Sequence, residues 1–301
     1  MLSVLIPVYN FEVVDLIKTL VDQCQYVDKP IEILCIDDGS SDEIRKTNQQ
    51  VAEWPEVTYR DLTENIGRSA IRLLLAESAR YDHLLFLDCD VLIHNRNFLK
   101  NYLACLEYPV VIGGIFYQDQ APADERLILR WKYGIHREQK SAAERMKIRY
   151  SHFVASNLLI EKKVFLNTQP KGKIFGYGHE DTAIGIRLKE LHIPLHHIDN
   201  AVEHAGLDTS EDFLIKSLSG VENLTRLFRA GLAGRELRIL NYYLNLKKWG
   251  LAGISRSILG LFLSTMEKNL TGMNPNLIYF DLWKMYHLIR LDQKFSRTTD
   301  S

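Results

Sequence analysis

The chain has 301 residues, of which 46% are hydrophobic and 25% charged, enough apolar material for one large globular domain or two small ones. A formal net charge of −1 argues against nucleic acid as the main partner. The four cysteines form no C-x-x-C pair and indicate reduced thiols, so we expect a cytoplasmic protein. Met1 to Ile6 runs into a predicted strand without a signal peptide, and no stretch is apolar enough to span a membrane.

Short apolar runs alternate with helical patterns over residues 1–90. The predicted strands are 3–8, 31–36, 57–60 and 84–87. The helices between them are predicted at 13–25, from Ser41 or Asp42 onward, and from 65 onward. This order predicts a parallel sheet with right-handed crossovers. No G-x-G-x-x-G follows the first strand, which argues against a dinucleotide-binding fold.

The pattern changes along the rest of the chain. A helix and a strand are predicted within 97–113, then a long loop and a helix at 137–149, a strand at 157–160, a helix at 180–191, and extended pieces at 195–198 and 201–204. Four helices follow, near 211–231, 235–248, 251–269 and 275–296. We therefore predict an α/β domain over 1–210 and a helical C-terminal extension over 211–301.

Two carboxylates follow the fourth strand at positions i and i+2. Asp88 and Asp90 would stand at the carboxyl end of a buried strand, the edge where open α/β sheets bind ligands. On an extended backbone both would point the same way and could hold a divalent cation with its phosphates. The alternative is that Asp88 caps the next segment and Asp90 is solvated.

Polar residues also end two other predicted strands. Asp38 lies in a run of Asp, Gly and Ser at 37–42, where a carboxylate could accept hydrogen bonds from a base or a ribose, although an ordinary turn with a helix cap explains the run equally well. His204 follows the extended piece at 201–203; because the chain has ten histidines, an ordinary histidine is the favoured interpretation on the residues alone, and a metal ligand is the alternative.

The order of these motifs resembles that of family 2 glycosyltransferases with the GT-A fold, in the galactosyltransferase-like and chondroitin-polymerase-like branch. The resemblance covers residues 1–206 and rests on the segments 7–10, 37–40, 88–90 and 176–181 and on His204. It implies a Rossmann-like, mostly parallel central sheet. It also implies transfer of a sugar from a nucleotide-diphosphate donor, here a UDP-sugar, to a glycan or lipid-linked acceptor in polysaccharide biosynthesis.

The same resemblance implies roles for individual residues. The donor-binding residues would be Pro7, Tyr9, Asn10, Asp38, Arg68 and Asp88. The metal ligands would be Asp88, Asp90 and His204, which suit Mn²⁺ better than Mg²⁺ because one ligand is a nitrogen. The acceptor would be held by Tyr177, Gly178 and Glu180.

Asp181 would be the catalytic base. It stands in the first turn of the predicted helix at 180–191, where the helix N-terminus keeps a carboxylate ionised and able to take a proton. A base acting on the acceptor hydroxyl implies one displacement and inversion at the anomeric carbon. The alternatives are a nucleotide-sugar-binding partner subunit without turnover and a nucleotidyltransferase.

Two features leave alternatives open. Arg68 and Arg72 could contact the donor diphosphate, but a solvated helix face is the favoured interpretation. Residues 231–301 hold ten lysine and arginine residues and five acidic ones, a net charge of +5. The apolar run Leu251–Leu263 could insert into the inner face of the membrane beside Lys247, Lys248 and Arg256, or it could pack on the domain or on a second subunit of a homo-oligomer.

Overall fold

The computed structural model describes residues 1–151, 153–169 and 178–299, which form two compact units. The sheet unit comprises Met1–Tyr117, Glu138–Gly172 and Ile184–Gly206, and the helical unit comprises Gln118–Arg137, Lys173–Ala183 and Leu207–Ser301. The last segment of the helical unit begins at Leu207, close to the domain boundary predicted at residue 210. Two earlier segments of that unit lie within the first predicted domain.

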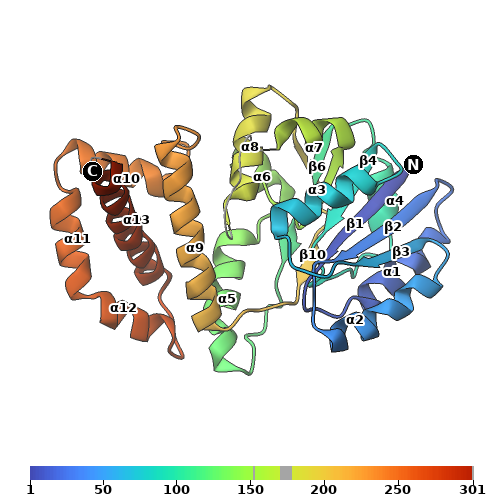
Figure 1. Ribbon diagram of the computed structural model, residues 1–301, viewed down its shortest axis with the longest axis horizontal. Helices are drawn as coiled ribbons and strands as arrows, with labels where there is room; N and C mark the ends of the chain where they lie inside the picture. Colours follow the sequence, from blue (N-terminus) through green and yellow to red (C-terminus); the bar gives the residue numbers. More distant parts are fainter. Residues whose placement is uncertain (152, 170–177, 300–301) are drawn as a thin grey trace. The chain divides into compact units, whose positions relative to one another are not determined.

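The central sheet has seven strands in the order β3-β2-β1-β4-β8-β6-β9 (Figure 1). The strands are β1 Leu2–Val8, β2 Ile31–Asp37, β3 Val57–Asp61, β4 His83–Leu87, β6 Val110–Ile112, β8 Asn157–Glu161 and β9 His196–His197. Only β8 runs antiparallel to its neighbours β4 and β6, while the other four pairs are parallel. The predicted α/β fold with a mostly parallel sheet is thus confirmed. A second sheet, β5-β10-β7, consists of Val91–Leu92, Val202–His204 and Ile115–Phe116.

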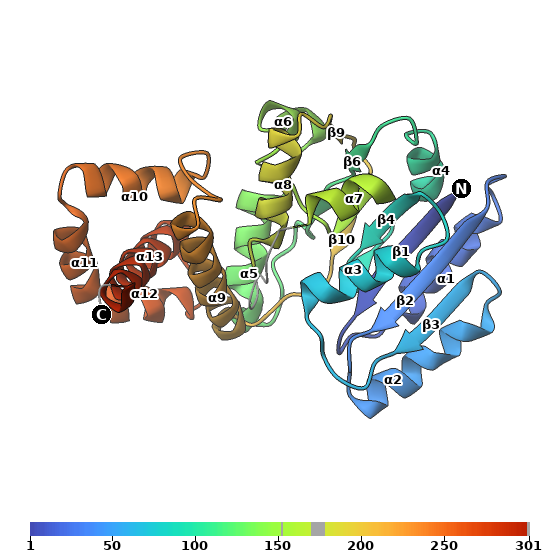
Figure 2. The ribbon, with the colours of Figure 1, turned by 45° about the horizontal axis from the view of Figure 1, so that its top comes forward.

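Helices cover both faces of the central sheet (Figures 1 and 2). They are α1 Val14–Cys24, α2 Asp42–Gln49, the 3₁₀ turn η1 Gln50–Glu53, α3 Arg68–Ser78, α4 Phe98–Leu103, α6 Ala142–Lys147, α7 Lys162–Thr168 and α8 Glu180–Glu190. On one face, Ile71 and Leu75 of α3 and Phe165 of α7 pack on Leu5 and Phe86 of the strands. Consecutive residues of these strands are buried, so the strands bury apolar side chains on both faces of the sheet, as their continuous apolar runs predict.

The segment 118–149 differs from the prediction of a long loop followed by a helix at 137–149. It contains the 3₁₀ turn η2 Glu125–Leu127, α5 Ile128–Tyr133, the π-helical turn η3 Gly134–Glu138, and α6. Helix α5 is short and highly charged, and it owes its stability to tertiary packing, because Leu129 is fully buried in the helical unit. Helix α6 begins only at Ala142, after a capping box in which Ser141 and Glu144 satisfy each other's backbone N–H groups.

The helical unit is built around the long helix α13. Its C-terminal helices are α9 Ser210–Arg229, α10 Arg238–Lys248, α11 Ala252–Leu261, α12 Leu263–Leu270 and α13 Leu277–Thr299. Helix α13 packs against α9, α11 and α12, with α9 and α11 on opposite sides of it (Figures 1 and 2). The single helix predicted at 251–269 is therefore wrong. Phe262 leaves the helical conformation, and the chain then turns so that Met266 of α12 enters the core.

A buried carboxylate joins three helices of this unit. Asp292 of α13 accepts hydrogen bonds from Arg229 of α9 at 3.1 Å, and from Tyr243 and Lys247 of α10 at 2.5 and 3.1 Å. Burial works to raise the pKa of Asp292, but these donors outweigh it and hold the pKa below its usual range. The carboxylate therefore stays ionised and fixes α9, α10 and α13 to one another.

Candidate functional site

The loops that follow β1 and β2 are joined by hydrogen bonds at the carboxyl edge of the sheet. Asn10 adopts a left-handed backbone conformation with φ of 49°, and its N–H donates to Ser40 Oγ at 2.7 Å. Its side-chain oxygen accepts from the Ser41 N–H at 2.9 Å. Tyr9 beside it is half exposed. The predicted donor residues after β1 thus form one rigid surface with the Asp-Gly-Ser loop after β2.

Asp38 and Asp88 both hold the start of α3, although they follow different strands. The Asp38 carboxylate accepts the N–H groups of Ile66 and Gly67 at 2.7 and 3.0 Å. The Asp88 carboxylate accepts from Arg68 at 2.7 Å and from Arg72 at 2.5 Å. The sheet topology therefore brings the carboxyl ends of β2 and β4, the parallel strands on either side of β1, to one helix N-terminus.

The two arginines of α3 correct an expectation. Their favoured interpretation as a solvated helix face is wrong, since the Arg72 side chain is only 6% exposed and both guanidinium groups pair with Asp88. Burial would raise the pKa of Asp88, but the charges of Arg68 and Arg72 outweigh it and lower the pKa to about 2. The result is an ionised carboxylate beside two cations at the edge of the sheet.

Asp90 lies in a turn that packs tightly against the end of β10. Its backbone oxygen accepts the N–H groups of Ala205 and Gly206, and its Oδ2 lies 3.6 Å from His204 Nε2. A side chain at Gly206 would place Cβ 2.6 Å from Asp90 Cβ and Oδ2, so only glycine fits there. In the strand pair β5–β10, His204 lies directly opposite Val91, the residue after Asp90. This pairing explains why Asp90 and His204, the two predicted metal ligands, lie close together.

Asp90 and His204 have the chemistry of a partial metal site. Within the described residues, the buried Oδ1 of Asp90 has no hydrogen-bond partner, which is the arrangement expected of a metal ligand. Burial raises the pKa of Asp90, and the nearby charge of Asp88 adds to this, so a cation would favour its ionised form. No group of three or more His, Cys, Asp or Glu residues in the described ranges could hold a metal alone, so a bound ion would need further ligands from a substrate.

Asp88 differs from Asp90 in its surroundings. Both Asp88 oxygens already accept hydrogen bonds from arginine. Within the described residues, Oδ2 of Asp90 lies near His204 and its Oδ1 has no hydrogen-bond partner. The two carboxylates, only two positions apart in the sequence, thus meet different partners. Tyr117 stacks on the His204 ring at 5.5 Å and helps to fix its orientation.

The loop before α8 belongs to the helical unit, and Tyr177 lies outside the described residues. Gly178 has φ of 100°, and an added Cβ would come within 2.9 Å of Gly220 Cα in α9. Both oxygens of the buried Glu180 accept the Gly178 N–H, at 3.2 and 3.1 Å. Asp181 is half buried in the first turn of α8, at the helix end where a carboxylate is stabilised.

His179 precedes α8 and carries strong constraints of its own. Its φ is 68°, and its Nδ1 hydrogen-bonds with Thr182 Oγ1 at 3.0 Å. Burial lowers the pKa of His179 to about 4, assisted by the charge of Lys284, so the imidazole is neutral at pH 7. No role was predicted for His179 from the sequence, because no local pattern records its left-handed backbone.

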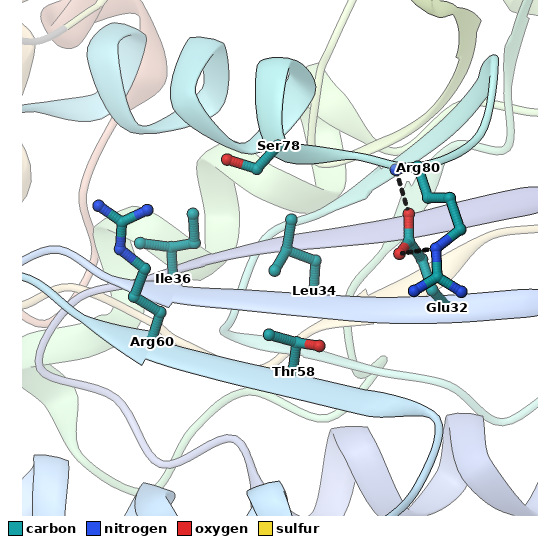
Figure 3. Close-up of a pocket in the computed structure, with 7 residues that line it drawn as sticks. All are labelled: Glu32, Leu34, Ile36, Thr58, Arg60, Ser78 and Arg80. Atoms are coloured by element: carbon teal, nitrogen blue, oxygen red, sulfur yellow. Dashed lines mark hydrogen bonds and ion pairs between the residues drawn. The ribbon is translucent and has the colours of Figure 1, made fainter.

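A cavity of about 280 Å³ lies between the end of α3 and the edge of the sheet (Figure 3). Its lining residues are Glu32, Leu34, Ile36, Thr58, Arg60, Ser78 and Arg80. Glu32 accepts the Arg80 N–H there, as the dashed line shows. None of the predicted site residues lines this cavity, so it is separate from the carboxyl-edge residues.

The family model described as "Glycosyl transferase family 2" matches residues 3–166. No curated protein matches the chain. Among solved structures, the chain is similar to the mannosyltransferase PcManGT from Pyrobaculum calidifontis in complex with GDP-Man and Mn²⁺, with 15% identity, 97% of this chain and 86% of that chain covered, and a TM-score of 0.57.

Two further structures are similar at a TM-score of 0.50 each. One is S. aureus TarS 1–349 in complex with UDP, with 14% identity, 99% of this chain and 91% of that chain covered. The other is glucosyl-3-phosphoglycerate synthase from Mycobacterium tuberculosis in complex with Mn²⁺, UDP and glucosyl-3-phosphoglycerate, with 14% identity, 77% of this chain and 81% of that chain covered. At these identities the likeness is one of fold.

Proposed function

The chain belongs to glycosyl transferase family 2, and we propose that it moves a sugar from a UDP-sugar to a glycan or lipid-linked acceptor with the help of a divalent cation. Membership of the family makes it a nucleotide-sugar glycosyltransferase, which decides against a nucleotidyltransferase or a non-catalytic subunit. The observation that carries the finer proposal is the carboxyl edge of the sheet, where Asp38 follows β2 and Asp88 and Asp90 follow β4, the parallel strands on either side of β1.

The donor would lie along the loops after β1 and β2. Asn10 and Ser40 fix one another there, so the loop presents a preformed surface to a nucleotide rather than one that must order on binding. Asp38 is nearly buried and already holds two backbone N–H groups, so we assign it to shaping the pocket for the base and ribose. Arg68, the more exposed of the two arginines on Asp88, would meet the diphosphate.

Asp90 and His204 would hold the cation, and the diphosphate would supply the remaining ligands. One carboxylate and one imidazole suit Mn²⁺. When bound, the cation stabilises negative charge on the departing diphosphate as a Lewis acid. Asp88 would contribute through its ion pairs, since arginine N–H groups occupy both of its oxygens. Two similar structures, from Pyrobaculum calidifontis and Mycobacterium tuberculosis, are complexes with Mn²⁺ and a nucleotide or nucleotide sugar, which supports this assignment.

Asp181 would take the proton from the attacking acceptor hydroxyl. It stands at the N-terminus of α8, where the helix dipole stabilises the ionised carboxylate that a base requires. Glu180 is turned toward the Gly178 N–H, so its part in acceptor binding would depend on that loop. A single attack assisted by one base inverts the configuration at the anomeric carbon.

The test is turnover with a panel of UDP- and GDP-sugars, with Mn²⁺ or with excess EDTA, scored by release of the nucleoside diphosphate. We expect a UDP-sugar to be consumed only with the cation, and Asp90→Asn to abolish this consumption. Asp22→Asn removes an exposed carboxylate from α1 and serves as the matched control that should keep full activity. Undiminished turnover in EDTA would refute the metal assignment, and consumption of GDP-sugars alone would refute the choice of donor.

A further inference from the structure

Helix α11 carries an apolar stripe on its outer side. The stripe consists of Leu251, Ile254, Ile258 and Leu261, whose spacing of three and four residues places them on one face of the helix. Their exposed fractions are 44%, 58%, 52% and 81%, and α11 has no buried residue. A helix in water normally turns such a stripe toward the core.

The face of α11 that packs on α13 is the less apolar one. Ala252, Ser255, Arg256 and Leu259 are less exposed than Ile254 and Ile258, and Gly260 lies against the ring of Tyr286. This face thus mixes polar and small residues with one leucine. Packing within the helical unit thus leaves the most apolar side chains of α11 uncovered. This arrangement is the reverse of a water-facing helix and indicates an apolar environment outside the unit.

Large aromatic side chains flank the stripe at both ends. Trp249 precedes it and is 73% exposed, and Phe262 follows it and is 56% exposed. Trp is suited to the boundary between water and hydrocarbon because its ring is apolar and its indole N–H is polar. The apolar stripe, Trp249 and Phe262 together form what we call the α11 surface.

The charge of the surrounding segment has a single sign. Residues 237–266 contain no Asp or Glu, and their charged residues are Arg238, Lys247, Lys248 and Arg256. Lys247 is engaged, since its Nζ binds Asp292 at 3.1 Å, whereas Lys248 directly precedes Trp249 and is exposed. An acid-free basic segment around an apolar stripe complements an anionic surface.

We propose that the α11 surface docks on an anionic membrane, with the apolar stripe among the acyl chains and Lys248, which adjoins Trp249, at the phosphate headgroups. A second copy of the chain is a poorer occupant, because a two-fold interface would bring the same basic side chains face to face. No helix in the described part of the chain is long and apolar enough to cross a membrane, so α11 would lie along the surface. This inference does not depend on the donor or the reaction proposed above.

The experiment is flotation of the full chain, without donor or metal, with vesicles of phosphatidylglycerol and phosphatidylcholine and with phosphatidylcholine alone. We expect binding to the anionic vesicles, weakened by salt. The variant Ile258→Ser/Leu261→Ser should reduce the partition coefficient on the order of 100-fold, because two large apolar side chains are lost. The variant Lys248→Glu should reduce it by about fivefold or more, the usual contribution of one basic residue near an anionic surface.

The matched control is Lys18→Glu, which changes the net charge equally at an exposed position of α1 and should leave binding unchanged. Circular dichroism checks that each variant is folded. The proposal is overturned if the chain binds neither kind of vesicle, or if Lys248→Glu has no more effect than the control. It is also overturned if the chain forms a dimer in solution that Ile258→Ser/Leu261→Ser dissociates, since a second copy would then cover the surface.

Discussion

The ion pairs of Asp88 should make a measurable contribution to the stability of the sheet unit. Lowering the pKa of this carboxyl from 3.8 to about 2 corresponds to about 2–3 kcal/mol of preference for its ionised form in the folded protein. Asp88→Asn also leaves the Arg72 guanidinium, 6% exposed, without its carboxylate. We expect this variant to lose about 3–5 kcal/mol of the free energy of unfolding at pH 7.

A double-mutant cycle measured by urea unfolding separates the pair from its surroundings. Arg72→Met should cost less, about 1–3 kcal/mol, because Asp88 keeps its contact with Arg68. The double variant should be more stable than the sum of the two losses predicts, by about 2 kcal/mol. Arg80→Met is the control, since Arg80 is 74% exposed and 4.0 Å from Glu32, and it should change stability by no more than about 0.5 kcal/mol. Losses that simply add, or an Asp88→Asn variant as stable as the control, would refute the reasoning.

Three further predictions concern the reaction and the pH dependence of stability. Asp181→Asn should leave donor affinity nearly unchanged and lower kcat by about 10²–10⁴-fold, and a kcat within a few-fold of the parent would exclude Asp181 as the base. Asp38→Ala should chiefly raise the donor KM, because it frees the N–H groups of Ile66 and Gly67 that shape the pocket; an unchanged KM with a reduced kcat would contradict this. Burial lowers the pKa of His287 to about 4 from 6.5, so the unfolded chain binds more protons between these values and stability is lost as pH falls through them, by up to about 3 kcal/mol. Unfolding measured from pH 7 to pH 4 should show a shallower loss for His287→Met, and identical slopes would contradict the prediction.

The sheet and its edge could be predicted because they depend on short-range patterns. Apolar runs separated by helical spacing dictate parallel strands, and parallel strands bring the residues after them to a common edge. Asp38, Asp88 and Asp90 were found in this way. The contact between Asp90 and His204 could not be predicted from local patterns, because it depends on the pairing of β10 with β5. Only the family resemblance pointed to it.

Other features depend on tertiary contacts that no local pattern records. Helical spacing could not say that Arg72 turns toward Asp88 rather than toward water. Helix α5 is too short and too charged to be recognised without the core that buries Leu129. No local pattern shows that Gly206 must be a glycine, since this depends on the close approach of Asp90. The capping box of Ser141 and Glu144, by contrast, was present in the sequence and would have placed the start of α6 correctly.

Binding of UDP measured by calorimetry, with and without Mn²⁺, tests the central claim most directly. If Asp90 and His204 hold a cation shared with the donor diphosphate, Mn²⁺ should tighten UDP binding by about tenfold or more, and Asp90→Asn should remove this gain. Asp22→Asn should retain it. Equal tightening by Mn²⁺ in the parent and in Asp90→Asn would contradict the assignment of the metal to this edge of the sheet.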